Sequence, residues 1–463
     1  MARPHLLTVA FAAGAEREAP LTWGQTAIWD VLRWLPEGGS GLNQLLRVTA
    51  PPDTGTNRVR AVLQTLMERH EVLRSAFLAR DGSLLQQVRA CGVLTAEVYE
   101  IPPGAGRAPT ARVAEALRSR PFVLDTELPV RAAVFTRDNQ VTEIVLAVSH
   151  MALDGWSLNL VQRELTALLQ AGATAPTLPD AQQPVERAAW ESSAAGLDRQ
   201  RRSLAFWERH LREVPAEMLG GEGGAPVLEW SRLDSVRLAR ALWSLNFRYR
   251  IKPSTTLLAA SALLLSAYQG TPEAALRLIV ATRFRSEARH TVGALNQNAL
   301  LRLPVGGGMF SELLRRAADA EFAAYQHSEY HPRLLDRLSA DIGRDRGIPV
   351  DGYHFFNDVR YTARAGRPQA ETGGGTALPA LAGRITTPTE QIQAKGARTF
   401  LYLHELTPHA VLTMGMDRRF GAGLTSARFL TDLEALVTRV AESDCPVDDL
   451  WSSHAAGTAA RRG

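Results

Sequence analysis

Cysteine is nearly absent from this sequence. The 463 residues include two cysteines, Cys91 and Cys445, which lie far apart in the chain. A disulfide framework or a cysteine metal site needs several cysteines at short spacings, so the sequence favours neither. The histidines show no clustered ligand spacing either, and we expect no bound metal. A reducing cytoplasm is the simplest setting for such a chain.

Lysine is almost as rare. Lys252 and Lys395 are the only lysines, so the other 50 of the 52 basic residues are arginines. The arginines are spread along the chain, and no basic block carries the interleaved aromatics typical of nucleic-acid binding. No apolar run is long enough to cross a membrane. We therefore expect neither a nucleic-acid nor a membrane partner, while the net charge of +4 suits docking of an acidic protein.

The remaining composition is that of an ordinary globular protein. Hydrophobic residues make up 45% of the chain and charged residues 22%, and the length suffices for two domains with full cores. Strand and helix patterns alternate in both halves, which predicts a mixed α/β (α+β) architecture in two lobes. An Ala-, Thr- and Pro-rich stretch at 173–184 reads as a linker. We place the domains at 1–175 and 185–463.

Periodicity predicts individual elements along the chain. An amphipathic helix over 56–69 is expected to be capped by Thr56 or Asn57 and to bury one apolar face. A helix after Ser157 is expected to end at Gly172. The other predictions are a first strand at 6–13, a hairpin around Asp81–Gly82, a fully buried helix at 256–268, a loop at 363–383, paired strands at 399–405 and 410–416, a last helix at 425–440 and a frayed tail at 452–463.

One stretch, 141–157, combines a buried strand with chemically useful side chains. The β-branched run ends at His150, and Asp154 and Gly155 follow just before the helix. His150 has an ordinary pKa suited to proton transfer near neutral pH. A purely structural interpretation is also open, in which His150 packs in the core and Asp154 caps the helix.

Further motifs occur in a fixed order around this stretch. Leu21–Trp29 contains Gln25 and Trp29, and Arg69–Phe77 reads RHEVLRSAF. We expect His70, within that second segment, to belong to a local polar network. Val292–Arg302 reads VGALNQNALLR, and Tyr353–Asn357 ends an apolar strand on an asparagine.

Together these motifs make the chain resemble the condensation domains of nonribosomal peptide synthetases, within the chloramphenicol acetyltransferase-like superfamily. Leu21–Trp29 is similar to the family's S-x-x-Q-x-R-x-W motif, and Arg69–Phe77 to R-H-E-x-L-R-T-x-F. Ser149–Gly155 resembles H-H-x-x-x-D-G, with serine in place of the first histidine. Val292–Arg302 resembles I-G-x-F-V-N-T-L-P-L-R, with Gln297 where asparagine is usual.

The resemblance implies two acetyltransferase-like lobes forming a V, with an active-site tunnel between them. It implies transfer of an acyl group from a phosphopantetheine arm of a carrier protein to an amine or hydroxyl, with no bound cofactor. His150 would accept or hold the nucleophile's proton, Asp154 would pair with Arg283, and the Gly155 N–H would stabilise the oxyanion. Supporting residues would be Ser149, Arg283, Trp156, Gln297 and Asn357.

Several alternatives stay open. Ser149 is compatible with an active enzyme or with a degraded scaffold that recruits partner proteins. A coenzyme A-dependent acyltransferase and an epimerisation domain are rivals from the same superfamily. The chain reads as a free-standing, monomeric enzyme that uses carrier proteins in trans. The donor, the acceptor, whether that acceptor is free or carrier-bound, and the amide or ester nature of the product are not determined by sequence.

Overall fold

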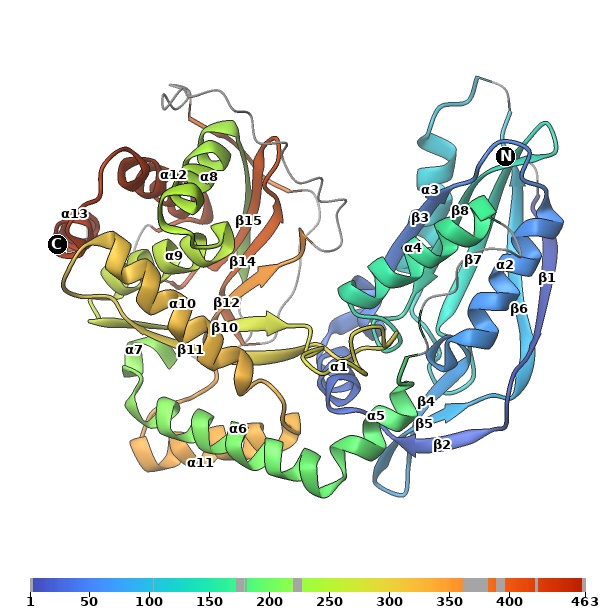
Figure 1. Ribbon diagram of the computed structural model, residues 1–463, viewed down its shortest axis with the longest axis horizontal. Helices are drawn as coiled ribbons and strands as arrows, with labels where there is room; N and C mark the ends of the chain where they lie inside the picture. Colours follow the sequence, from blue (N-terminus) through green and yellow to red (C-terminus); the bar gives the residue numbers. More distant parts are fainter. Residues whose placement is uncertain are drawn as a thin grey trace. The chain divides into compact units, whose positions relative to one another are not determined.

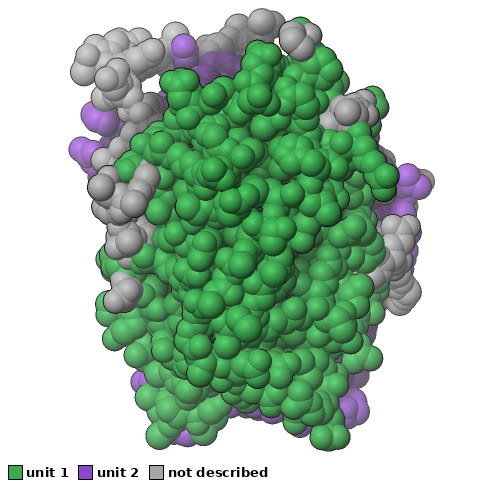
Figure 2. Space-filling view, turned by 90° about the vertical axis from the view of Figure 1, so that its right-hand side faces the viewer, with its two compact units in different colours: residues 1–198, 281–296 green, residues 199–280, 297–463 purple. Residues whose placement is uncertain are grey.

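The computed structural model describes residues 3–102, 104–171, 179, 181–219, 227–360, 382–388, 396–420 and 424–459. By their internal contacts these residues form two compact units (Figures 1 and 2). Unit 1 comprises residues 1–198 and 281–296, and unit 2 comprises residues 199–280 and 297–463. The predicted domains at 1–175 and 185–463 therefore differ from the units in where they place residues 185–198 and 281–296.

Unit 1 is built on a five-stranded sheet in the order β1-β6-β7-β8-β3 and a three-stranded antiparallel sheet in the order β2-β5-β4. In the larger sheet β6 and β7 are parallel and the other neighbours are antiparallel. Its strands are β1 (His5–Ala12), β2 (Arg17–Pro20), β3 (Gln44–Thr49), β4 (Ser75–Arg80), β5 (Ser83–Val88), β6 (Cys91–Glu100), β7 (Val130–Arg137) and β8 (Gln140–Val148).

Helices cover both faces of the larger sheet. The main core of unit 1 lies beneath α2 and α4, which are neighbours in Figure 1, and a smaller apolar cluster joins α3 to β7 and β8. Because β7 and β8 have helices on both faces, they are apolar on both faces. The helices are α1 (Trp23–Trp34), α2 (Thr56–Arg69), α3 (Ala108–Ser119), α4 (Gly155–Ala171) and α5 (Pro184–Glu191), with η1 (Pro36–Leu42) and η2 (Glu71–Arg74) as 3-10 turns.

Unit 2 contains a seven-stranded mixed sheet in the order β11-β10-β12-β14-β15-β9-β13. β12 runs parallel to both β10 and β14, and the other neighbouring strands are antiparallel. The strands are β9 (Leu228–Ser235), β10 (Glu273–Val280), β11 (Gln297–Pro304), β12 (Tyr353–Asp358), β13 (Arg384–Thr386), β14 (Ala397–Glu405) and β15 (Ala410–Asp417).

The helices of unit 2 pack around a second large core. α9 is buried from Pro253 through Tyr268, as its apolar sequence predicted, and Gly270 ends it with φ of 71°. The helices are α6 (Ala194–Glu213, which begins in unit 1), α7 (Ala216–Leu219), α8 (Val236–Tyr249), α9 (Pro253–Gln269), α10 (Phe310–Gln326), α11 (Pro332–Arg346), α12 (Ser426–Glu442) and α13 (Val447–Ala459).

The mixed α/β class is confirmed, and most predicted elements are present. Two details were wrong. The α2 helix is capped by Gly55 without a side-chain hydrogen bond, so neither Thr56 nor Asn57 caps it. The described part of the expected frayed tail, residues 452–459, is helical. Val447 and Leu450 bury their side chains and Trp451 donates to the Ser266 hydroxyl, which anchors α13.

Some predictions fall on residues that the structure does not describe. They are the helix end at Gly172, residues 173–178 and 180 of the linker, and residues 363–381 of the loop at 363–383. Within the described ranges, no helix combines the length and apolar character that crossing a bilayer requires.

Candidate active site

The His150 side chain lies in a tight turn between β8 and α4. The carbonyl oxygen of Ser149 accepts hydrogen bonds from the backbone N–H groups of Ala152 and Leu153, at 2.9 and 3.2 Å. Ser149 is buried, and its hydroxyl accepts from the Met151 N–H at 3.3 Å. The serine that replaces the expected first histidine therefore stabilises the turn that carries His150.

One ring nitrogen of His150 forms a hydrogen bond within this turn. Nδ1 lies 2.8 Å from the carbonyl oxygen of Leu153. A carbonyl oxygen can only accept, so Nδ1 must carry the hydrogen. The neutral ring therefore has its lone pair on Nε2. Burial lowers the pKa of His150 below its ordinary value, and the bond to Leu153 and the nearby Asp154 carboxylate only partly oppose that effect. His150 is thus an unprotonated base at neutral pH.

Asp154 both caps α4 and anchors a distant segment. Its Oδ1 accepts from the backbone N–H of Ser157 at 2.8 Å, which is an N-terminal capping bond. The Arg283 guanidinium donates to both carboxylate oxygens, at 2.7 and 3.0 Å. The backbone N–H of Leu295 donates to Oδ2 at 2.9 Å. The predicted pair with Arg283 is present, and the capping interpretation holds as well.

Arg283 belongs to the segment 281–296, which leaves β10, packs within unit 1 and returns as β11. Its guanidinium also donates to the carbonyl oxygens of Ala281, Thr291 and Gly293. An always-charged fork of donors is well suited to hold a carboxylate and several carbonyls at once. Arg283 therefore organises its own loop as well as the loop that carries His150.

Ser157 is a connecting residue that the motifs did not single out. Its fully buried hydroxyl donates to the Gly293 carbonyl at 2.8 Å and lies 2.7 Å from Arg283 Nη2 and 2.9 Å from the Gly293 N–H. The one available signal was a serine in the first turn of the helix, three residues after the capping Asp154.

The start of α4 carries two more predicted residues. Gly155 is the first residue of the helix, so its N–H is one of those with no acceptor inside the helix. Trp156 is half-buried, and its indole N–H donates to the Arg289 carbonyl at 3.2 Å. Trp156 thereby ties the helix start to segment 281–296.

The structure does not gather every predicted site residue in one unit. Ser149, His150, Asp154, Gly155, Trp156 and Arg283 all lie in unit 1, while Gln297 and Asn357 belong to unit 2. Gln297 is buried at the start of β11 and donates to the Tyr330 carbonyl at 3.0 Å. Asn357 lies on β12 beside Tyr402 of β14, and its Oδ1 is buried without a hydrogen bond.

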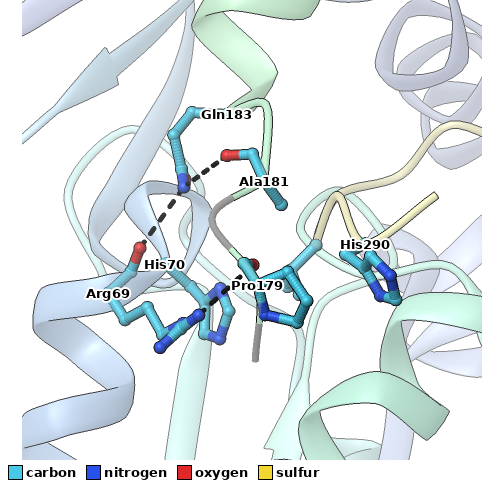
Figure 3. A pocket seen from close by; sticks show the side chains of 7 residues that line it. Arg69, His70, Pro179, Ala181, Gln183 and His290 are labelled. Atoms are coloured by element: carbon cyan, nitrogen blue, oxygen red, sulfur yellow. Dashed lines mark hydrogen bonds between the residues drawn. The ribbon is translucent and has the colours of Figure 1, made fainter. Parts of the chain in front are cut away.

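A cavity of about 250 Å³ lies elsewhere in unit 1 and is lined by Arg69, His70, Pro179, Ala181, Gln183, His290 and Val292 (Figure 3). His70 Nε2 lies 2.5 Å from a Glu164 carboxylate oxygen, and Arg69 pairs with the other oxygen at 3.2 Å. The expectation that His70 joins a local polar network is therefore confirmed. Among the residues that the structure describes, no three His, Cys, Asp or Glu side chains are grouped to hold a metal ion.

The sequence is similar to a known domain family and to parts of several peptide synthetases. A sequence model described as a condensation domain matches residues 15–346. The chain is 25% identical over 345 residues to a linear gramicidin synthase polypeptide of Brevibacillus parabrevis, and the match covers 70% of this chain and 4% of that protein. It is 28% identical over 341 residues to phosphinothricin tripeptide synthetase PhsC of Streptomyces viridochromogenes, covering 70% and 31%. The chain thus spans a minor part of these relatives.

Solved structures share the fold. A condensation domain that mediates chain release from the enacyloxin polyketide synthase superposes with a TM-score of 0.69 at 20% identity, covering 93% of this chain and 83% of that one. SgcC5 of Streptomyces globisporus, solved with (R)-(-)-1-(2-naphthyl)-1,2-ethanediol and sucrose, gives 0.66 at 21% identity, covering 91% and 98%.

Proposed function

Because this chain belongs to the condensation-domain family, we propose that it transfers an acyl or aminoacyl group from a carrier-protein thioester to an amine or hydroxyl acceptor. The carrier protein, supplied in trans to a monomer, presents the acyl group on a phosphopantetheine arm. The product is an amide or an ester, and the arm is released as a free thiol. SgcC5 was solved with an aryl diol, which is a reason to test alcohols beside amines.

The observation that supports this proposal most directly is the hydrogen bond from His150 Nδ1–H to the Leu153 carbonyl. It leaves Nε2 as the acceptor, and a lowered pKa keeps that acceptor unprotonated at neutral pH. Nε2 takes the proton of the attacking N–H or O–H as the new bond to the carbonyl carbon forms. When the tetrahedral intermediate collapses, the C–S bond breaks and the proton passes to the leaving thiolate.

The other site residues act through position in this proposal. The Gly155 N–H, at the positive end of the α4 dipole, faces the oxyanion of the intermediate. The Asp154 carboxylate is engaged by the Ser157 and Leu295 N–H groups and by Arg283. We therefore assign Asp154 and Arg283 as positioning residues that hold the His150 turn.

The test is acceptor-dependent unloading of an acylated carrier protein, followed by intact mass spectrometry with candidate amines and alcohols. His150→Ala is expected to lower the rate by about 100- to 10,000-fold, the usual contribution of a general base. The wild-type rate should fall in acid with an apparent pKa below 6.5, because protonation of Nε2 removes the base. Equal rates for wild type and His150→Ala would reject the role of His150.

The same assay separates the rival functions. Consumption of free acyl coenzyme A without a carrier protein would indicate a coenzyme A-dependent acyltransferase. Binding of the carrier protein without transfer of its acyl group to any acceptor would indicate a scaffold that recruits partner proteins. Both outcomes contradict the proposal in a way that mass spectrometry detects directly.

A further inference from the structure

An aromatic stack runs across two strands of the unit 2 sheet and has no part in the proton transfer proposed above. The Phe400 ring lies parallel to Phe355, with centroids 5.1 Å apart and an interplanar angle of 11°. On its other side Phe400 stacks on Tyr402 at 4.3 Å and 6°. His404 continues the stack 5.8 Å beyond Tyr402. The stack passes from the buried Phe355 to the half-buried Tyr402 and His404.

A buried tryptophan continues the aromatic stack toward β9. The Trp230 ring lies 6.2 Å from that of Tyr402, and strand register pairs Trp230 with Gly415 of β15. A Cβ at position 415 would come within 2.6 Å of the indole ring. Glycine at 415 is therefore what gives the indole room above the strand.

These rings lie on the sheet face opposite α12. Side chains alternate between the two faces of a strand. On β9, Ser231 faces α12, because its hydroxyl lies 2.8 Å from that of Ser426. Trp230 and Arg232 must then point to the other face. Figure 1 shows α8 and α12 on the same side of β14 and β15.

A row of polar residues runs beside the aromatic stack. Asn357, Tyr402, Thr413 and Arg232 are successive neighbours across β12, β14, β15 and β9. Oδ1 of Asn357 is buried without a hydrogen-bond donor. A buried polar atom of this kind is rare and costly unless a partner arrives.

Arg232 supplies a positive charge at the other end of that row. Within the described residues its guanidinium forms no ion pair or hydrogen bond. Asp234, two residues further along the same face, is already 2.6 Å from His409. Burial and the nearby Arg232 lower the pKa of His404 to about 4. His404 is therefore neutral at pH 7, and among the described residues the row presents Arg232 as an uncompensated cation.

We propose that this face of unit 2 binds an elongated aryl carboxylate that carries an N–H or O–H donor at its far end. Tyr402, at the half-buried end of the aromatic stack, contacts the ring, Arg232 pairs with the carboxylate, and Asn357 Oδ1 accepts from the donor. Asn357 and Arg232 are three strand spacings apart, roughly 14 Å between their backbones. A ligand with one ring and short substituents is therefore too short to reach both residues. The identification of this ligand as the acceptor rests on the proposed acyl transfer. The binding of the ligand to this face does not depend on that function.

Isothermal titration of the full chain with 4′-aminobiphenyl-4-carboxylate tests the site, and its carboxamide is the matched neutral probe. Wild type should bind the acid about 10- to 100-fold more tightly than the amide, as a charge-assisted hydrogen-bonded pair provides. Arg232→Gln should remove that preference. Arg240→Gln, on the exposed surface of α8, should keep it. Tyr402→Leu should weaken both probes about 10-fold.

Equal binding of acid and amide by the wild type, or no binding of either, would overturn the proposal, as would an unchanged preference in Arg232→Gln. Arg232→Lys guards against loss of folding: it keeps the charge without the planar fork and should retain part of the preference. The titration contains no acyl donor. A chain that binds the acid but unloads no carrier protein would therefore refute the proposed function and leave this site standing.

Discussion

Two features meet at His150: its turn selects one tautomer, and an ion pair holds that turn to a segment more than 120 residues away in the chain. The Asp154 carboxylate is almost fully buried and receives the Arg283 guanidinium in a bidentate geometry. Removing one partner leaves a charge in a poorly hydrated interior. The pair matters for the position of the base, since Asp154 directly precedes Gly155 and α4.

Replacing Asp154 by asparagine is expected to lower the free energy of unfolding by about 3–5 kcal/mol, because Arg283 keeps its charge without a counter-ion. Arg283→Gln should cost a similar amount. The double variant should cost clearly less than the sum of the two, because neither charge then remains unpaired. Urea unfolding of all four proteins measures this coupling, and strictly additive losses would show that the two side chains act independently.

Segment 281–296 is the element on which the unit 1 site depends. It reaches α4 through Arg283, through the Leu295 N–H on Asp154, and through Gly293 on Ser157. It also packs against the start of α1, where the Thr22 hydroxyl donates to the Ala294 carbonyl at 3.4 Å. Gly24 permits this approach: a Cβ there would lie 2.4 Å from the same carbonyl oxygen.

Gly24→Ala should therefore displace the segment and destabilise the protein by about 1–3 kcal/mol, the usual cost of overpacking. Acyl-transfer activity should fall as well, since the displaced segment carries Arg283. The matched control is Gly106→Ala, where an added Cβ meets nothing within 4 Å. Thermal unfolding and hydrogen exchange of residues 281–296 provide the measurement, and indistinguishable behaviour of the two variants would contradict this account.

At the scale of the whole molecule, buried neutral histidines link stability to pH. Burial lowers the pKa of His150, His210 and His404, and that of His354 lies well below its ordinary value. The folded state therefore binds fewer protons than the unfolded state between those lowered values and about 6.5. The resulting stability is fully present above pH 6.5 and is lost as pH falls below it.

The free energy of unfolding should accordingly decrease between pH 7.5 and 5.5, by up to about 1.4 kcal/mol for each of the most strongly shifted histidines. Urea titrations at several pH values measure the slope. His404→Gln should reduce it, because glutamine does not titrate. A stability that stays constant or rises as pH falls to 5.5 would refute the assignment of these histidines as neutral in the folded protein.

Local elements were largely predictable from sequence. The buried face of α2 consists of Val59, Val62, Leu63, Leu66 and Met67, the positions that helical periodicity predicted. The strand before His150 and the all-buried α9 also followed from their apolar patterns. Less distinctive segments were missed: no element was assigned to Gln44–Thr49, which is β3, or to Pro332–Arg346, which is α11.

The residues of the candidate site also divide into those that were predictable from sequence and those that were not. His150, Asp154 and Gly155 could be located from the sequence, because strand and helix periods place them at a strand end and a helix start. Three contacts became visible with the folded chain: Ser157 bonds to Arg283, Gly24 makes room for Ala294, and Trp230 packs near Tyr402. Those contacts depend on strand register and on the packing of segments far apart in the chain. Local periodicity carries no information about either.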